Sequence, residues 1–162
     1  MPINQVVINA SPLIALFKGQ QAELLPQLFE KIVVPQGVWE EITARKPEDI
    51  AAQQLRAVSW IQRVDTVRVP ATILTWDLGK GESEVLSWVV SHPDYMAIVD
   101  DLAARRCADA LGLKVLGTGA TLILAKRRGL ISNVAPRLKA LRDAGLYLSD
   151  RLIQLLKEQA GE

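Results

Sequence analysis

Short apolar runs of strand length, separated by segments long enough for helices, constrain the fold of this chain more than any other feature. The runs are rich in Val, Ile and Leu and cover 5–8, 31–34, 95–99 and 114–116, with a weaker extended stretch at 60–64. A short, continuous apolar run is typical of a strand buried on both faces, and intervening helices favour parallel pairing. We therefore expect an α/β fold of three layers, with a central parallel sheet and helices on both faces.

The length and composition predict one globular domain. The 162 residues, 49% hydrophobic and 23% charged, fit a single domain spanning 1–162. Residues 1–5 lack the basic and long apolar stretches of a secretory signal, and no apolar run is long enough to cross a membrane. The single cysteine, Cys107, excludes an intrachain disulfide and a zinc site built from cysteines, and the single histidine, His92, excludes a multi-histidine metal site. These features favour a reducing compartment and a cytoplasmic location.

Helix signals fill the segments between the strands. Ser11 is predicted to cap the first helix, with Pro12 at its first position and Gly19 at its end. A turn at 77–81 is predicted to precede a helix that begins at Glu82. Ser149 is predicted to cap the last helix. The other predicted helices cover 22–29, 37–44, 50–58, 101–111, 118–126, 134–144 and 150–159, and 67–69 is predicted to be extended.

Polar residues follow three of the predicted strands. Asn9 and Ser11 follow the first, Asp100 and Asp101 follow the 95–99 run, and Thr118 follows the 114–116 run. Ligands bind at the carboxyl ends of the strands in open parallel sheets, so these residues are candidates for one site. Ser11, Asp101 and Thr118 could instead simply cap helices. Capping does not explain two adjacent carboxylates, which repel each other unless a cation or an arginine neutralises them.

Two glutamates are further candidates. Glu82 shares a helix face with the apolar residues 85, 86 and 89, where a carboxylate costs free energy unless it is paired or binds a metal. Glu82 could also be a first-turn residue stabilised by the helix dipole. Glu41 lies at the margin of another helix, where an ordinary solvated acid is the simpler interpretation. Glu84 points away from the apolar stripe and is predicted to be solvated.

These acids suggest metal-assisted chemistry on phosphates. Carboxylates without supporting histidine or cysteine suit a hard ion such as Mg²⁺ or Mn²⁺. Such an ion activates water and neutralises charge during phosphoryl displacement. The segment 101–145 carries nine Lys/Arg and three Asp, a local charge of +6 that could attract a nucleic acid. Arg105 and Arg106 are the leading candidates for contact with phosphates, ahead of Lys126, Arg127 and Arg128, although solvated helix faces explain the pattern equally well.

At these residues the sequence resembles a subfamily of PIN domains. The segment 9–16 is similar to its opening Asp-x-Ser-Pro-Leu-Ile block, and the segments 34–42, 78–84, 98–105 and 117–131 resemble its later blocks in order. The resemblance implies a PIN-like fold and metal-dependent cleavage of single-stranded RNA. It also implies a toxin role restrained by a small antitoxin protein, and a homodimer. The homodimer is favoured as well by four tryptophans, a residue type enriched at interfaces.

The resemblance also assigns roles to the candidate residues. It implies catalytic acids at Glu41, Glu82 and Asp100, with Asp101 as an auxiliary acid. The metal ligands would be Asn9, Glu82 and Asp100, and the supporting polar groups would be Ser11 and Thr118.

The sequence departs from this subfamily at the first acid, which is Asn9 here instead of Asp. An amide still offers an oxygen to a metal, but it removes one negative charge from the site. Two hypotheses follow. The first is an active Mg²⁺- or Mn²⁺-dependent endoribonuclease, which the other acids favour. The second is a catalytically impaired domain that binds RNA or a protein, which Asn9 favours.

Overall fold

The computed structural model describes residues 4–65 and 67–162, so the expectation for residues 1–3 lies outside the described part of the chain. The strands are β1 (Gln5–Ile8), β2 (Lys31–Pro35), β3 (Ile61–Val64), β4 (Met96–Ile98) and β5 (Val115–Leu116). The helices are α1 (Ala10–Lys18), α2 (Leu24–Leu28), α3 (Gln36–Thr43), α4 (Ile50–Ala57), α5 (Ala71–Leu74), α6 (Lys80–Ser91), α7 (Leu102–Ala110), α8 (Thr118–Arg127), α9 (Ala135–Asp143) and α10 (Asp150–Gln159). No described helix is long and apolar enough to cross a membrane.

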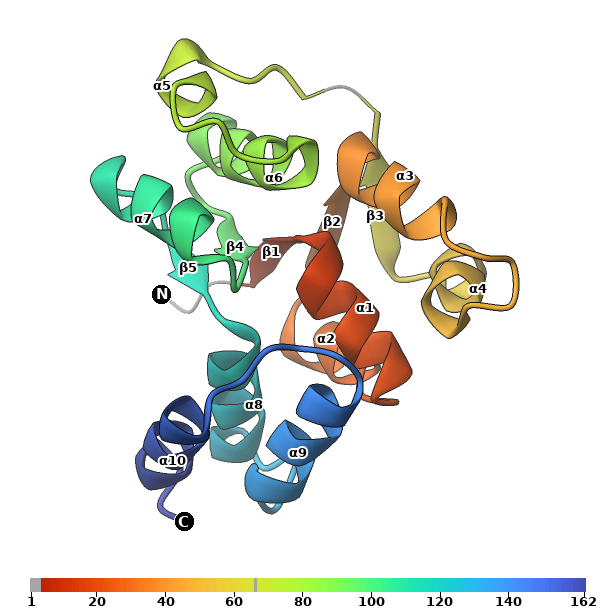
Figure 1. Ribbon diagram of the computed structural model, residues 1–162, viewed down its shortest axis with the longest axis vertical. Coiled ribbons are helices and arrows are strands. Elements are labelled where there is room, and N and C mark those ends of the chain that lie inside the picture. The colour runs from red at the N-terminus through yellow and green to blue at the C-terminus, as the bar shows by residue number, and fades with distance from the viewer. Residues whose placement is uncertain (1–3, 66) are drawn as a thin grey trace.

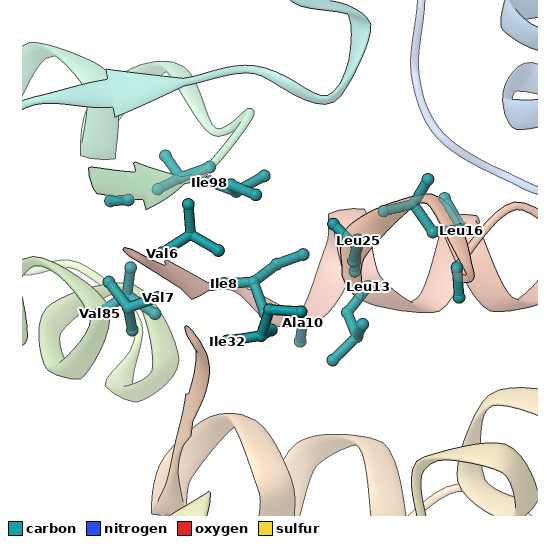
Figure 2. Close-up of a cluster of buried hydrophobic side chains, with 14 of the residues drawn as sticks. Val6, Val7, Ile8, Ala10, Leu13, Leu16, Leu25, Ile32, Val85 and Ile98 are labelled. Atoms are coloured by element: carbon teal, nitrogen blue, oxygen red, sulfur yellow. The ribbon is translucent and has the colours of Figure 1, made fainter. Parts of the chain in front are cut away.

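All described strand pairs are parallel, in the order β3-β2-β1-β4-β5 (Figure 1). The central strand β1 is buried over Val6, Val7 and Ile8 because it has a neighbour on each side and helices above and below. Alternate residues of a strand face opposite sides of the sheet. Figure 2 shows Val7 beside Val85 of α6, which packs across β1, β2 and β4. The predicted three-layer α/β/α architecture is confirmed.

The first helix begins earlier than its capping signal predicted. Asn9, and not Ser11, occupies the N-cap position, with extended backbone angles of φ −80° and ψ 167°. Its carbonyl oxygen accepts the N–H of Leu13, while its side chain makes no cap hydrogen bond. Pro12 still lies in the first turn, where a missing N–H costs nothing. The Asn9 side chain is therefore left to interact elsewhere.

Other boundaries differ in ways that affect the site. Helix α6 begins at Lys80, with Gly79 as its N-cap, so Glu82 lies in its first turn and not at its first residue. The predicted extended stretch at 67–69 belongs to no strand, and it leads into the short, unpredicted helix α5. The caps at Asp101 and Ser149 are confirmed, since each accepts a backbone N–H three residues later. At α8 the N-cap is Gly117, so Thr118 is its first helical residue.

Candidate active site

The candidate residues lie along the carboxyl edge of the sheet. Asn9 follows β1 and Asp100 follows β4, and these strands are direct neighbours, with the N–H of Asn9 bonded to the carbonyl of Ile98 at 3.1 Å. Thr118 opens the helix that follows β5, on the other side of β4. The three strands that precede these residues are therefore neighbours, as predicted.

Asn9 is buried, with 2% of its surface exposed. Its Nδ2 donates to Oε1 of Glu82 at 3.3 Å. Its Oδ1 is also buried and has no hydrogen-bond partner among the described residues. This amide therefore uses its donor on an acid of α6 and leaves a buried acceptor unpaired, a state that costs free energy in a folded protein.

The unpaired oxygen lies beside a small residue of α6. A methyl group built on Gly81 would lie 3.2 Å from Oδ1 of Asn9 and 3.9 Å from Oε1 of Glu41. The same methyl would lie 3.4 Å from Cγ2 of Val38 on α3. Oxygen atoms from the end of β1 and from α3 thus border one small space, which exists because residue 81 has no side chain.

Glu82 is bonded to the same Asn9 amide, with its carboxylate beside Gly79, and its charge acts on Glu41. Glu41 is exposed as a whole residue, but its carboxyl group is partly desolvated. Partial burial raises the pKa of Glu41 above its ordinary value, and the negative charge of Glu82 raises it further, while Arg45 acts in the opposite direction. We call Asn9, Glu41 and Glu82 the Asn9 group. In this group, the carboxylates of Glu41 and Glu82 carry like charges, and the buried Oδ1 of Asn9 has no hydrogen-bond partner among the described residues.

The Asp100 side chain is arranged differently. Its Oδ1 accepts the N–H of Thr118 at 2.9 Å, and its Oδ2 accepts the Thr118 hydroxyl at 2.6 Å. Asp101 caps α7, its Oδ2 accepting the N–H of Ala104 at 2.9 Å. We call Asp100, Asp101 and Thr118 the Asp100 group. In it, each carboxylate already holds a helix start in place.

The remaining predicted residues fall outside both groups. Ser11 is exposed in the first turn of α1 and makes no side-chain hydrogen bond among the described residues. Arg105 lies near Asp100 and donates to the carbonyl of Val99 at 3.4 Å, without forming an ion pair within 4 Å in the described part of the chain. Arg106 is exposed on the first turns of α7. The structure thus places the Arg105 side chain near Asp100, and Arg106 on the same helix.

Two other basic residues of the 101–145 segment are engaged elsewhere. Lys126 binds the carbonyl of Ala160 and the carboxylate of Glu162, while Arg128 donates to the carbonyl of Leu28. They lie at the far end of α8, about 12 Å or more from Thr118 at 1.5 Å per helical residue. Lys126 and Arg128 are therefore not available to flank the site.

The prediction for Glu84 is wrong. Glu84 is buried, with 5% of its surface exposed, because α6 packs against α3 as well as against the sheet. The signal that sequence analysis missed is Gly37, whose small size admits the Glu84 carboxylate. A further residue that was not predicted is Arg45, whose charge acts on Glu41.

A comparison with protein families matches residues 5–162 to a family described as "PIN domain". The chain belongs to the PIN-domain family. PIN domains are generally nucleases that use divalent metal ions. No curated protein matched the sequence.

The side chains of this PIN domain suit a divalent ion that needs only a few protein oxygen ligands. Among the described residues, no three His, Cys, Asp or Glu side chains form a metal-binding group. The Asn9 group instead offers two carboxylates and a buried amide oxygen that lacks a partner. Mg²⁺ is commonly held by one or two carboxylates and keeps several waters, so an oxygen-only set of this size suits it.

Proposed function

We propose that this PIN domain is a Mg²⁺- or Mn²⁺-dependent endoribonuclease that cleaves single-stranded RNA. The observation that supports the proposal is the buried Asn9 amide, whose Oδ1 lies with Glu41 beside Gly81 and whose Nδ2 is bonded to Glu82. A buried acceptor without a partner beside two like charges is expensive in the free protein. A cation would relieve both costs at once.

The proposed metal ligands are Asn9, Glu82 and Asp100. The two hydrogen bonds from Thr118 use only part of the capacity of the Asp100 carboxylate, which has about four lone-pair positions. When bound, the ion supplies an activated water and stabilises charge on the phosphate. Glu41 is the proposed proton acceptor, since a raised pKa makes its carboxylate more basic. Asp101, Ser11 and Thr118 support the site, and Arg105 and Arg106 contact RNA phosphates.

The biological setting is proposed on family grounds. PIN domains often act as toxins restrained by a small antitoxin protein, and we propose the same arrangement in the cytoplasm for this chain. We also propose a homodimer. Three tryptophans have partners within the chain: Trp39 lies under Arg63, Trp60 stacks on Phe17, and Trp88 stacks on His92.

Of the four tryptophans, Trp76 has no such partner among the described residues and is 38% exposed, so it is the tryptophan that remains a candidate for a dimer interface. Light scattering at micromolar concentration tests the dimer directly. A monomeric mass there would contradict it.

Asn9 favours a second function, a domain that binds RNA or protein without cleaving. The hydrogen bond from Asn9 to Glu82 stabilises the metal-free site, which an inactive domain would retain. The two functions are separated by titrating the parent protein and Asn9→Asp with Mn²⁺ by calorimetry, beside an RNA cleavage assay. The nuclease proposal expects the parent to bind Mn²⁺ and to cleave.

The Asn9→Asp variant sharpens the same experiment. Asp and Asn are nearly isosteric, so the fold should persist while a carboxylate replaces the amide. Mn²⁺ affinity should rise by about 1–3 kcal/mol. The metal-free variant should be less stable than the parent, because a third carboxylate joins the Asn9 group, and Mn²⁺ should reverse that loss. Cleavage found only in the variant would identify the parent as the non-cleaving domain.

A further inference from the structure

Glu84 has a buried carboxylate that the proposed mechanism does not use. Its Oε1 accepts the N–H of Gly37 at 3.2 Å, in the first turn of α3. Its Oε2 is buried and has no partner among the described residues. The neighbouring Lys80 pairs with Glu40 instead, at 3.1 Å on the surface. Glu84 is therefore a buried acid of α6 whose one hydrogen bond is to the start of α3.

Gly37 is matched to this carboxylate. A methyl group built on Gly37 would collide with Oε2 of Glu84 and would lie 3.1 Å from Cγ of Lys80. The backbone of Gly37 does not adopt a left-handed conformation, so glycine is required here for space and not for its torsion angles. A carboxylate at a helix start also interacts favourably with the helix dipole. The pair thus fixes the first turn of α3 against α6.

The same two helices carry Glu41 and Glu82. Glu41 lies four residues after Gly37, about one helical turn further along the same face of α3. Glu82 lies two residues before Glu84 on α6, and Gly81 lets Val38 of α3 approach closely. The contact at Gly37 is therefore one turn of α3 away from Glu41, on which the charge of Glu82 acts.

We infer that Glu84 is a positioning residue, whose bond to Gly37 holds α3 against α6 and so sets Glu41 opposite Glu82. The consequence for metal binding and cleavage rests on the proposed function. The helix placement itself does not, so it can be tested in the metal-free protein.

The first test is a double-mutant cycle on thermal stability without metal. Glu41→Gln removes a charge that faces Glu82, so it should raise the melting temperature of the parent. In a Glu84→Ala background the two acids are no longer held together, and the gain should largely disappear. Residues that act through each other give such non-additive effects, while independent sites add. If the effects of Glu41→Gln and Glu84→Ala on the melting temperature simply add, the inference is overturned.

Ser149→Ala is the matched control. It also removes one hydrogen bond to a helix start, at α10, which is remote from Glu41. Glu41→Gln should give the same gain in this background as in the parent. A gain lost equally in both backgrounds would reflect general destabilisation and would count against the inference.

Gly37→Ala tests the inference without removing the acid. Alanine is the better helix former, so helix propensity alone predicts a stabler protein. The added methyl displaces the Glu84 carboxylate, so we expect instead a lower melting temperature and the same loss of the Glu41→Gln gain. Glu84→Gln retains an oxygen for the N–H of Gly37 and should restore most of the coupling. A Gly37→Ala protein with intact coupling would contradict the inference even if Glu84→Ala fails to fold.

The last test uses Mn²⁺ and RNA. Partners that orient metal ligands typically contribute about 10–100-fold in metal affinity or activity, so Glu84→Ala and Gly37→Ala should each weaken Mn²⁺ binding by at least about tenfold. The kcat for RNA should fall while KM stays near that of the parent, because these residues do not touch RNA.

The outcomes separate the two ideas. A parent that neither binds Mn²⁺ nor cleaves RNA defeats the proposed function, while the metal-free cycle still decides the placement of α3. A parent that binds Mn²⁺ with an affinity unaffected by Gly37→Ala overturns the positioning role.

Discussion

The carboxylate of Asp100 accepts two hydrogen bonds from Thr118, whereas the side-chain oxygen of Asn9 accepts none from the described residues, although both residues follow neighbouring parallel strands. In the Asp100 group, the carboxylate oxygens accept hydrogen bonds from the starts of α7 and α8. The Asn9 group keeps an unpaired acceptor and two acids with like charge. Unsatisfied buried polar groups cost stability, and folded proteins retain few of them. The difference indicates that the Asp100 group stabilises two helix starts besides its proposed part in metal binding, whereas the Asn9 group leaves an oxygen available for a ligand.

Cleavage should depend far more on the Asn9 group than on the helix cap in the Asp100 group. Glu82→Gln removes a proposed ligand charge while keeping the shape of the side chain. We expect RNA cleavage to fall by about 10²–10⁴-fold, the range typical of a directly participating group. Asp101→Asn should change the rate little, because asparagine caps helices as well as aspartate does. Single-turnover cleavage of a labelled RNA measures both, and equal losses would remove the distinction between the groups.

Stability should depend more on the Asp100 group. Asp100→Ala leaves the N–H and the hydroxyl of Thr118 without their charged acceptor, and hydrogen bonds to charged groups are among the stronger ones. We expect the free energy of unfolding to fall by about 2 kcal/mol. Thr118→Val loses only the hydroxyl bond and should cost about 1 kcal/mol. Urea denaturation measures both changes, and a larger loss for Glu82→Gln than for Asp100→Ala would reverse the comparison.

Arg105 and Arg106 lie on α7, directly after Asp101, and should contribute to RNA binding. Each cation that neutralises a phosphate of a single strand adds about 0.7 to the slope of log affinity against log salt. Arg106→Ala should therefore lower the slope by about this amount. Arg127 is exposed at the far end of α8, so Arg127→Ala is the control and should leave the slope unchanged. Fluorescence anisotropy over a salt series measures it, and an unchanged slope for Arg106→Ala would remove this residue from the RNA path.

The smallest expected effect is the pH dependence of Glu41. Burial first, and the charge of Glu82 second, raise its pKa in the folded protein above the ordinary value of 4.5. A raised carboxyl pKa costs stability above the folded pKa, and the cost vanishes once the pH falls below 4.5. Glu41→Gln should therefore stabilise the metal-free protein at pH 7, by about 0.5 kcal/mol for a partly exposed pair.

The difference between Glu41→Gln and the parent should close as the pH is lowered through 4.5. Thermal unfolding at several pH values measures it. A difference in stability that stays constant across the series would show that neither burial nor the charge of Glu82 raises the pKa of Glu41.

Much of this arrangement could be predicted from the sequence. The β-branched runs locate β1, β2, β4 and β5 within one or two residues, because local hydrophobic pattern and strand formation coincide in a buried parallel sheet. The order of the chain through strands and helices also brings Asn9 beside Asp100. Capping chemistry located the starts of α7 and α10 correctly, since Asp101 and Ser149 act on N–H groups only three residues away.

Contacts between distant helices were decided by the tertiary structure. Glu84 has the local pattern of a solvated residue, yet it is buried because Gly37, 47 residues earlier, leaves room for its carboxylate. The Asn9 side chain likewise turns away from its own helix start and donates to Glu82, 73 residues later. By itself the sequence determined the strands, the parallel sheet and which residues stand at its carboxyl edge. Only the tertiary packing decided which of the distant polar groups are paired, because that depends on spacing at the ångström level between segments that local sequence does not relate.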